Sequence, residues 1–239
     1  MSNAVLTTAE AQRASLGVAV SQTAYALNNG GGIVPGQPLV YIDDRTTAGR
    51  PGYTALNLSI PTGFVVRGIF QDTSPAGKNT GADMFVAYNP TTKQVLIGMA
   101  GTNGIGHDMT DTKADISYVG ANQAKWLATN SSFRTLLTDP DIGLGREAGG
   151  IANLRFIVGG DSLSAVPAIL VPTILVSGLP DQSALPISGL SASQFSITNV
   201  VPLGANYAAS RLGIADNVQA FSQSAEIFNF TVWNDQTGY

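Results

Sequence analysis

Residues 157–166 read IVGGDSLSAV, and the interpretation of the whole chain turns on this stretch. An apolar run typical of a β-strand ends in two glycines and an aspartate, and Ser162 stands directly before a second apolar run. A serine at a sharp turn between a strand and a helix can hold its hydroxyl outward, while the next backbone amide points at a developing oxyanion. The alternative is that Ser162 is an ordinary turn serine or a helix N-cap.

The composition limits both the size of the fold and its chemistry. The chain has 239 residues, enough for one large domain with a full hydrophobic core. Charged residues make up 12%, and the net charge is −4. A basic surface for nucleic acid or for an anionic membrane is therefore not expected. Cysteine is absent and His107 is the single histidine, which excludes disulfides, thiolate metal sites and any site that needs two imidazoles.

The sequence predicts neither a signal peptide nor a membrane span. The first twenty residues lack a basic segment followed by an apolar core, which a secretory signal would need. The longest apolar run, at 163–179, is interrupted by Pro167 and Pro172, whereas a span needs about 20 consecutive apolar residues. We therefore expect this run to be buried core.

The first half of the chain contains a strong β-hairpin signal. Met84–Tyr88 and Gln94–Ala100 flank an Asn-Pro turn, and almost every residue of the second run is apolar. A strand that is apolar on both faces belongs in the middle of a covered sheet, so we expect Ile97 and Val158 to be almost fully buried. The periodicity also predicts a helix at 8–28, stopped by NNGGG, and short strands at 38–42, 55–60 and 63–70.

In the second half, predicted strands alternate with predicted helices. Helices are expected near 119–129, at 131–138, after Ser162 and near 205–214, and strands at 153–159, 195–201 and 226–234. Strands separated by helices imply crossover connections. The predicted fold class is therefore α/β and α/β-hydrolase-like, with a mostly parallel central sheet, helices on both faces and a single domain over residues 1–239.

Three of the predicted strands end in residues suited to acyl transfer. Thr102, Ser162 and Asp235 each follow one of them. Because sites in open α/β sheets form at the carboxyl ends of the strands, we expect these three positions to share one rim. The Leu163 amide would then be one oxyanion donor, the loop at Thr102 would supply the second, and an acid on a later strand end would orient a histidine.

At these positions the sequence resembles a known family. The matching segments are Met99-Ala100-Gly101-Thr102, Lys113-Ala114-Asp115-Ile116, Gly160-Asp161-Ser162-Leu163-Ser164-Ala165 and Asn234-Asp235. By the order of its elements, the chain is similar to the fungal-type (class 3) lipases over roughly residues 20–235. The resemblance implies Ser162 as nucleophile, Asp235 as triad acid, and the amides of Thr102 and Leu163 as the oxyanion hole. It implies hydrolysis of a carboxylic ester through an acyl-enzyme, with no cofactor or metal, on an acylated lipid or an acylated polysaccharide.

The segments also depart from the family pattern. Asp161 precedes the serine, and its negative charge disfavours an oxyanion nearby. Ser164 places a Cβ where the family has glycine and where helix and strand pass closely. Ala100 replaces an arginine, and Pro167 and Pro172 each remove a backbone hydrogen bond from the following helix.

The position of the general base is the largest departure. The triad histidine should follow Asp235, but the sequence given ends at Tyr239 without one. A serine hydroxyl is a weak nucleophile without a base to take its proton, so either the sequence given stops short of the triad histidine or the domain has none. His107 is the candidate substitute, in a glycine-rich loop five residues past Thr102; its alternative role is that of an exposed loop histidine beside Asp108.

Structural roles compete with the catalytic ones elsewhere too. Thr102 could simply terminate a strand, Asp235 could form a turn, and Asp115 could cap a helix or form an ion pair. Asp108, Asp111 and Asp115 do not have the spacing of an EF-hand loop, so a metal site is not predicted. The Gly-Asp-Ser-Leu string has the motif sequence of the GDSL-type esterases, but those enzymes carry their serine near the N-terminus, whereas here the motif is central. A GDSL-type esterase is therefore not predicted.

A second functional class remains open. The chain would then be a catalytically degenerate lipase-like module with a structural or attachment role, because a fold does not determine function. Its low charge, its many small neutral polar residues and its lack of cysteine fit a part of a larger assembly, such as a virion-associated bacteriophage tail or fibre protein. The partners would be other proteins of the assembly, and the chain would be the N-terminal part of a longer protein.

Overall fold

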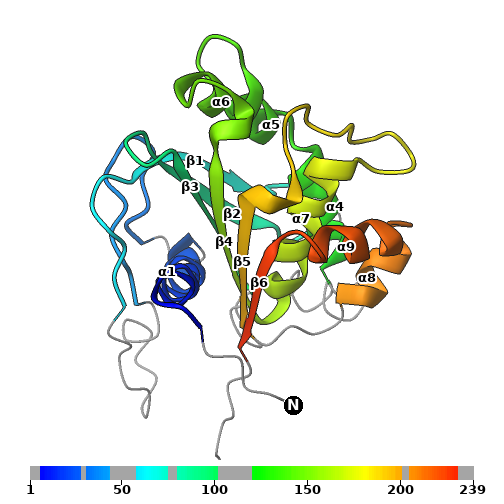
Figure 1. The fold of residues 1–239 in the computed structure, drawn as a ribbon, viewed down its shortest axis with the longest axis horizontal. Coiled ribbons are helices and arrows are strands. Elements are labelled where there is room, and N and C mark those ends of the chain that lie inside the picture. Colours follow the sequence, from blue (N-terminus) through cyan, green and yellow to red (C-terminus); the bar gives the residue numbers. More distant parts are fainter. Residues whose placement is uncertain are drawn as a thin grey trace, which may run out of the picture.

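A computed structural model of the chain describes residues 6–27, 31–43, 58–74, 80–101, 120–200 and 205–230. Over these residues one six-stranded sheet runs through the molecule in the order β1-β2-β3-β4-β5-β6 (Figure 1). The strands are β1 (Val65–Gln71), β2 (Asp83–Asn89), β3 (Gln94–Met99), β4 (Arg155–Asp161), β5 (Phe195–Val200) and β6 (Glu226–Phe230). The first three pair antiparallel and β3 to β6 pair parallel, which confirms the mostly parallel sheet.

Helices cover both faces of the sheet. In Figure 1, α1 lies on one face, and α4, α7, α8 and α9 lie on the other. The helices are α1 (Thr8–Ala24), α4 (Ala121–Thr129), α5 (Ser131–Thr138), α6 (Leu144–Glu147), α7 (Ala165–Ser177), α8 (Ala205–Arg211) and α9 (Ala215–Ser222). Short 3₁₀ turns are η1 (Tyr25–Leu27), η2 (Ile151–Asn153), η3 (Ser162–Ser164) and η4 (Ala192–Gln194). The predicted α/β-hydrolase-like class is confirmed.

The central strands are apolar on both sides because each side faces its own core. Ile97 and Val158 are paired across β3 and β4, and both are 0% exposed, as predicted. They face α7, whereas their neighbours Leu96 and Ile157 pack with residues of α1. The continuous apolar run is therefore a period-two pattern in which both faces are buried.

Helix α7 is the buried centre of one layer. Its residues from Ala165 to Leu175 are all buried, and Thr173 donates its hydroxyl proton to the Ile169 carbonyl, 2.9 Å away. Pro167 lies in the first turn, where backbone amides have no partner within the helix, so only Pro172 interrupts the hydrogen-bond ladder. No helix among the described residues combines the length and apolarity that crossing a bilayer requires.

Helix α1 packs unusually close to the sheet because glycines meet at the contact. A Cβ on Gly17 would lie 2.1 Å from Thr198 Oγ1 of β5, and a Cβ on Gly159 would lie 2.2 Å from the Gly17 carbonyl oxygen. Real side chains do not tolerate such distances, so glycine is needed on both elements. This contact sets the depth at which α1 lies on β4 and β5.

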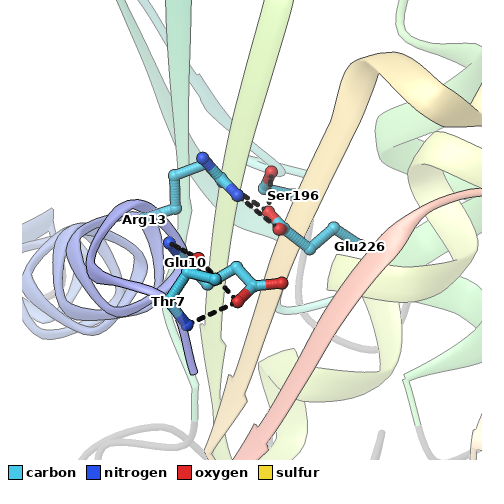
Figure 2. Close-up of polar contacts among 5 residues, drawn as sticks. All are labelled: Thr7, Glu10, Arg13, Ser196 and Glu226. Carbon is cyan, nitrogen blue, oxygen red and sulfur yellow. Dashed lines mark hydrogen bonds and ion pairs between the residues drawn. The ribbon is translucent and has the colours of Figure 1, made fainter. Parts of the chain in front are cut away.

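An ion pair fastens the start of α1 to the start of β6 (Figure 2). The helix begins with a capping box between Thr7 and Glu10. One turn later, Arg13 donates from Nε and Nη2 to the two carboxylate oxygens of Glu226, each at 2.6 Å, and Ser196 donates its hydroxyl proton to the same group. The Arg13 hydrogen bonds hold the pKa of Glu226 below its ordinary value.

The structure corrects several predicted boundaries. The run 38–42 is not a strand: it touches β1 through a single bridge, Pro38 to Val65, and then leaves the sheet edge. Residues 58–60 are not in a strand, and 55–57 lie outside the described residues. The strand predicted at 153–159 is shifted to 155–161, because residues 151–153 form a 3₁₀ turn. The short helices α6 and α9 were not predicted.

Candidate functional site

The strand-to-helix turn predicted at Ser162 is present. Strand β4 ends at Asp161, η3 begins at Ser162, and α7 follows at Ala165 without an intervening loop. The backbone of Ser162 is thus the first position after a buried parallel strand, at the carboxyl end of the sheet. This is the position at which open α/β sheets form their sites.

The sharpness of this turn depends on Gly160. A Cβ there would lie 2.3 Å from the Ser164 carbonyl oxygen and 2.8 Å from the Ala168 Cβ. The close crossing of strand and helix therefore lies between Gly160 and the backbone of Ser164, as the sequence suggested, and the residue there that must lack a Cβ is Gly160. Ser164 is buried without a clash, and its hydroxyl both accepts from the Asp161 amide and donates to the Asp161 carbonyl, each at 2.8 Å.

The side chain of Asp161 lies on the face of the sheet that α1 covers. Its Oδ2 accepts a hydrogen bond from Gln22 Nε2 of α1 at 2.9 Å, and its backbone carbonyl lies 3.4 Å from the Tyr25 hydroxyl. Sequence reasoning missed both partners, which lie 139 and 136 residues away from Asp161 along the chain. No local signal in the sequence indicates that Gln22 and Tyr25 contact Asp161, because the sequence of α1 is that of an ordinary core helix.

The end of β3 lies directly against the turn, as predicted. Met99 pairs with Gly160, and a Cβ on Gly101 would lie 2.4 Å from the Asp161 carbonyl oxygen and 2.6 Å from the Tyr25 hydroxyl. Glycine is therefore required at 101, which lies directly against the turn. The carboxyl ends of β3 and β4 share one rim.

Strand β6 ends on the same side of the sheet as the carboxyl ends of β3 and β4, and β5 lies between β4 and β6. Val200 of β5 pairs with Asp161 on one side and with Phe230 on the other. Neighbouring strands lie about 4.8 Å apart, so the ends of β4 and β6 are about 10 Å apart. Strands β4 and β6 therefore end level with each other, at Asp161 and Phe230.

A buried asparagine lies between these two strands. Asn199 of β5 is fully buried and donates from Nδ2 to Asn229 Oδ1 of β6 at 3.2 Å, while its own Oδ1 has no hydrogen-bond partner among the described residues. Asn199 was not predicted as a site residue, although an asparagine inside the strand pattern FSITNVV was a usable signal.

Asp72 is a second acidic residue on the side of the sheet where β3 and β4 end, and it directly follows β1. Burial raises its pKa, but hydrogen bonds from Ser74 and Thr80 outweigh that effect and hold the pKa below its ordinary value. The Asp72 carboxylate accepts from both backbone amides at 3.0 and 2.7 Å and from the Thr80 hydroxyl at 2.7 Å. Because these bonds favour the ionised form, Asp72 is suited to holding Ser74 and Thr80 in place and poorly suited to proton transfer at neutral pH.

Several predicted site residues lie outside the described residues, and their roles stay predictions. These are Thr102, His107 and Asp235, together with Asp108, Asp111 and Asp115. Leu163 lies in η3 with its side chain buried. Among the residues that the structure does describe, no cluster of three histidine or acidic side chains could hold a metal ion.

Comparisons with known proteins bear on the fold. No family model matches the chain, and no curated protein matches its sequence. Its structure is similar to lipase II from Rhizopus niveus, with a TM-score of 0.53 and 14% identity over 95% of this chain and 72% of that one. It is also similar to the Rhizomucor miehei lipase in its propeptide complex, with a TM-score of 0.50 and 17% identity over 87% and 60% of the two chains. The chain therefore has a fungal-lipase-like α/β-hydrolase fold.

Proposed function

We propose that this chain is a carboxylic-ester hydrolase domain in which Ser162 is the nucleophile. The observation that carries the proposal is the turn at the end of β4, where Ser162 stands between a buried strand and a helix. Gly160 permits the close crossing at this turn, and the Ser164 hydroxyl makes two hydrogen bonds to the backbone of Asp161. Such a turn exposes a hydroxyl at the sheet edge and places the next amide beside it.

The oxyanion would be held by two backbone amides from neighbouring strands. One is that of Leu163, directly after the nucleophile, and the other is that of Thr102. Support comes from Gly101, the residue before Thr102, because a Cβ there would lie 2.4 Å from the Asp161 carbonyl oxygen at the turn. Donors fixed by packed backbone need no reorganisation as the negative charge develops, which is what makes such a site effective.

The acid and the base are proposed to be Asp235 and His107. The separation of about 10 Å between the ends of β4 and β6 leaves room for an imidazole between a serine and a carboxylate. His107 is the single histidine of the chain and stands six residues after Gly101, which follows β3 at this rim. The histidine would take the Ser162 proton as the ester is attacked and return it to the departing alcohol. Water then releases the acid from the acyl-enzyme by the same proton transfers in reverse order.

The substrate class follows from the reaction. An ester of a fatty or acetyl-type acid on a lipid or a surface polysaccharide offers the carbonyl that this arrangement would attack. The chemistry requires no cofactor, because nucleophile, base and oxyanion donors are all supplied by the chain.

Covalent labelling tests the nucleophile. A fluorophosphonate should react with the wild-type chain at Ser162, located by mass spectrometry of the peptide, and p-nitrophenyl esters should be turned over. Ser162→Ala should abolish both and change the free energy of unfolding by under about 1 kcal/mol. Ser177→Ala, which removes a hydroxyl bonded to the Thr173 carbonyl at the far end of α7, is the matched control and should label normally. Equal labelling of wild type and Ser162→Ala would contradict the proposal.

The base and the acid are tested separately. His107→Ala and Asp235→Asn should each lower ester turnover by about 10³–10⁴-fold if they complete the triad. Normal turnover in His107→Ala would show that the base is another group, while leaving Ser162 as nucleophile.

A catalytically degenerate scaffold is the second candidate. The observation that favours it is Asp161, a carboxylate placed directly before the serine, where a negative charge opposes an oxyanion. Under this alternative the fold serves as a structural or attachment module of a larger assembly, with protein partners. A folded wild-type chain that neither labels nor turns over esters would support it.

A further inference from the structure

We propose that Gln22 is a positioning residue for the candidate nucleophile, because its amide holds the Asp161 carboxylate on the α1 face of the sheet and away from Ser162. This inference rests on the proposed function. It identifies the feature through which the chain accommodates an acidic residue directly before its serine.

The geometry places the two side chains on one face. Along β4, a Cβ on Gly159 would point at the backbone of α1, and a Cβ on Gly160 would point at α7. Since side chains alternate along a strand, Asp161 faces α1, where Gln22 Nε2 lies 2.9 Å from its Oδ2. Gln22 itself is only 4% exposed, so its amide is held in place by packing.

An amide donor suits this role chemically. A carboxylate beside the serine has two oxygens that accept hydrogen bonds, and left unrestrained it could take up the backbone amides meant for the oxyanion. Its charge would also oppose the oxyanion, more strongly the closer it lies. A glutamine donates a hydrogen bond without adding a charge, so it restrains the carboxylate and leaves the electrostatics of the rim otherwise unchanged.

The surroundings of Gln22 fix it from both sides. Gly17, five residues earlier, sets the depth of α1 on β5, and Thr23 Oγ1 accepts from the Ile42 amide at 3.2 Å. Tyr25, three residues later, places its hydroxyl 3.4 Å from the Asp161 carbonyl. The end of α1 therefore supports the turn, with Gln22 as its contact to the carboxylate.

The test compares Gln22→Met with Asp161→Asn and with the double variant. Methionine keeps the length of the side chain and removes the donor. We expect Gln22→Met to lower both kcat and the fluorophosphonate labelling rate by about tenfold, with KM nearly unchanged, because the carboxylate can then approach the oxyanion. Asp161→Asn should raise the labelling rate, and Gln22→Met should have little further effect in the Asp161→Asn background.

Gln123→Met is the matched control. Gln123 is equally buried and donates from Nε2 to the Gly81 carbonyl at 2.7 Å, so its loss tests the general effect of removing a buried amide. It should lower the thermal midpoint without changing kcat. If Gln22→Met proves unfolded by its thermal transition, Asp161→Asn decides the question: a raised labelling rate supports the positioning role, and an unchanged rate overturns it, because the carboxylate would then have no effect for Gln22 to limit.

The failures of the two proposals are distinguishable. Wild-type labelling at Ser162 together with an unchanged rate in Gln22→Met, or an equal loss in both backgrounds, would overturn the positioning role alone. A wild-type chain that does not label overturns the proposed function and this role with it.

Discussion

Ser164 and Asp161 are joined by two hydrogen bonds through a single hydroxyl, which accepts from the Asp161 amide and donates to the Asp161 carbonyl, each at 2.8 Å. A hydroxyl can do both because it carries one proton and two lone pairs. Where the fungal-type pattern has glycine, this chain thus has a side chain that closes the turn. The departure from the pattern is compensated within the turn itself.

Removing this hydroxyl should loosen the turn. Ser164→Ala loses both bonds at a fully buried site and should lower the free energy of unfolding by about 1–3 kcal/mol, measured by urea denaturation. Ser177→Ala, which loses one bond in the last turn of α7, should cost less. The same Ser164→Ala chain should label more slowly with fluorophosphonate. An unchanged denaturation midpoint would show that the two bonds contribute nothing.

Adding a methyl group at Gly160 should be strongly destabilising. The new Cβ would lie 2.3 Å from the Ser164 carbonyl oxygen, and a backbone atom cannot move aside without distorting the turn. We expect Gly160→Ala to lower stability by about 2–3 kcal/mol. Gly31→Ala is the control, since its nearest neighbours would be 3.8 Å away, and its thermal midpoint should stay close to that of the wild type. Similar midpoints for the two variants would argue against the close crossing.

The pair between Arg13 and Glu226 should make stability depend on pH in the acidic range. Because Arg13 lowers the pKa of Glu226 in the folded chain, its contribution is fully present above the ordinary value of 4.5 and is lost as the pH falls below it, through the lowered folded pKa. The pair is partly exposed, so we expect about 0.5–1 kcal/mol.

Two variants check this contribution. Glu226→Gln and Arg13→Gln should each flatten the stability curve measured by chemical denaturation between pH 6 and about pH 3, and the double variant should flatten it no further. A Glu226→Gln curve that runs parallel to the wild type over this interval would show that the pair does not contribute.

The centre of the sheet should show the largest cost of truncation. Ile97→Ala creates a cavity between β3 and α7 and should lower stability by about 2–5 kcal/mol. Ile142→Ala removes the same atoms from a side chain that is 71% exposed, and its free energy of unfolding should change by under about 0.5 kcal/mol. Comparable losses in the two variants would contradict the central position of β3.

Prediction succeeded where local pattern and burial coincide. The hairpin of β2 and β3 followed from two apolar runs around an Asn-Pro turn, and its register pairs Val86 with Ile97 as a simple hairpin should. Prediction failed at 38–42, whose apolar residues resemble those of a strand. Leu39 is buried there and donates its amide proton to the Phe64 carbonyl, but Val40 is 61% exposed, because the strand pairing of this segment is limited to the single bridge at Pro38.

In the candidate site, too, the features that a local pattern records were predicted and those that depend on distant partners were not. The turn at Ser162 was predictable because strand, small residues and helix follow one another within ten residues. Asn199 and Gln22 were not, since each matters through a partner on another element.

The sequence by itself determined which segments lie at the centre of the sheet and that a serine stands where a buried strand turns into a helix, because burial on both faces and tight turns leave their signature in consecutive residues. The tertiary structure alone decided that β5 lies between β4 and β6, that the sheet comes closest to the helices at Gly17, Gly159 and Gly160, and that Arg13 pairs with Glu226, 213 residues away along the chain. These features depend on how deeply the helices pack on the sheet and on which strands become neighbours. Both result from the summed packing of the whole chain, which no short pattern records.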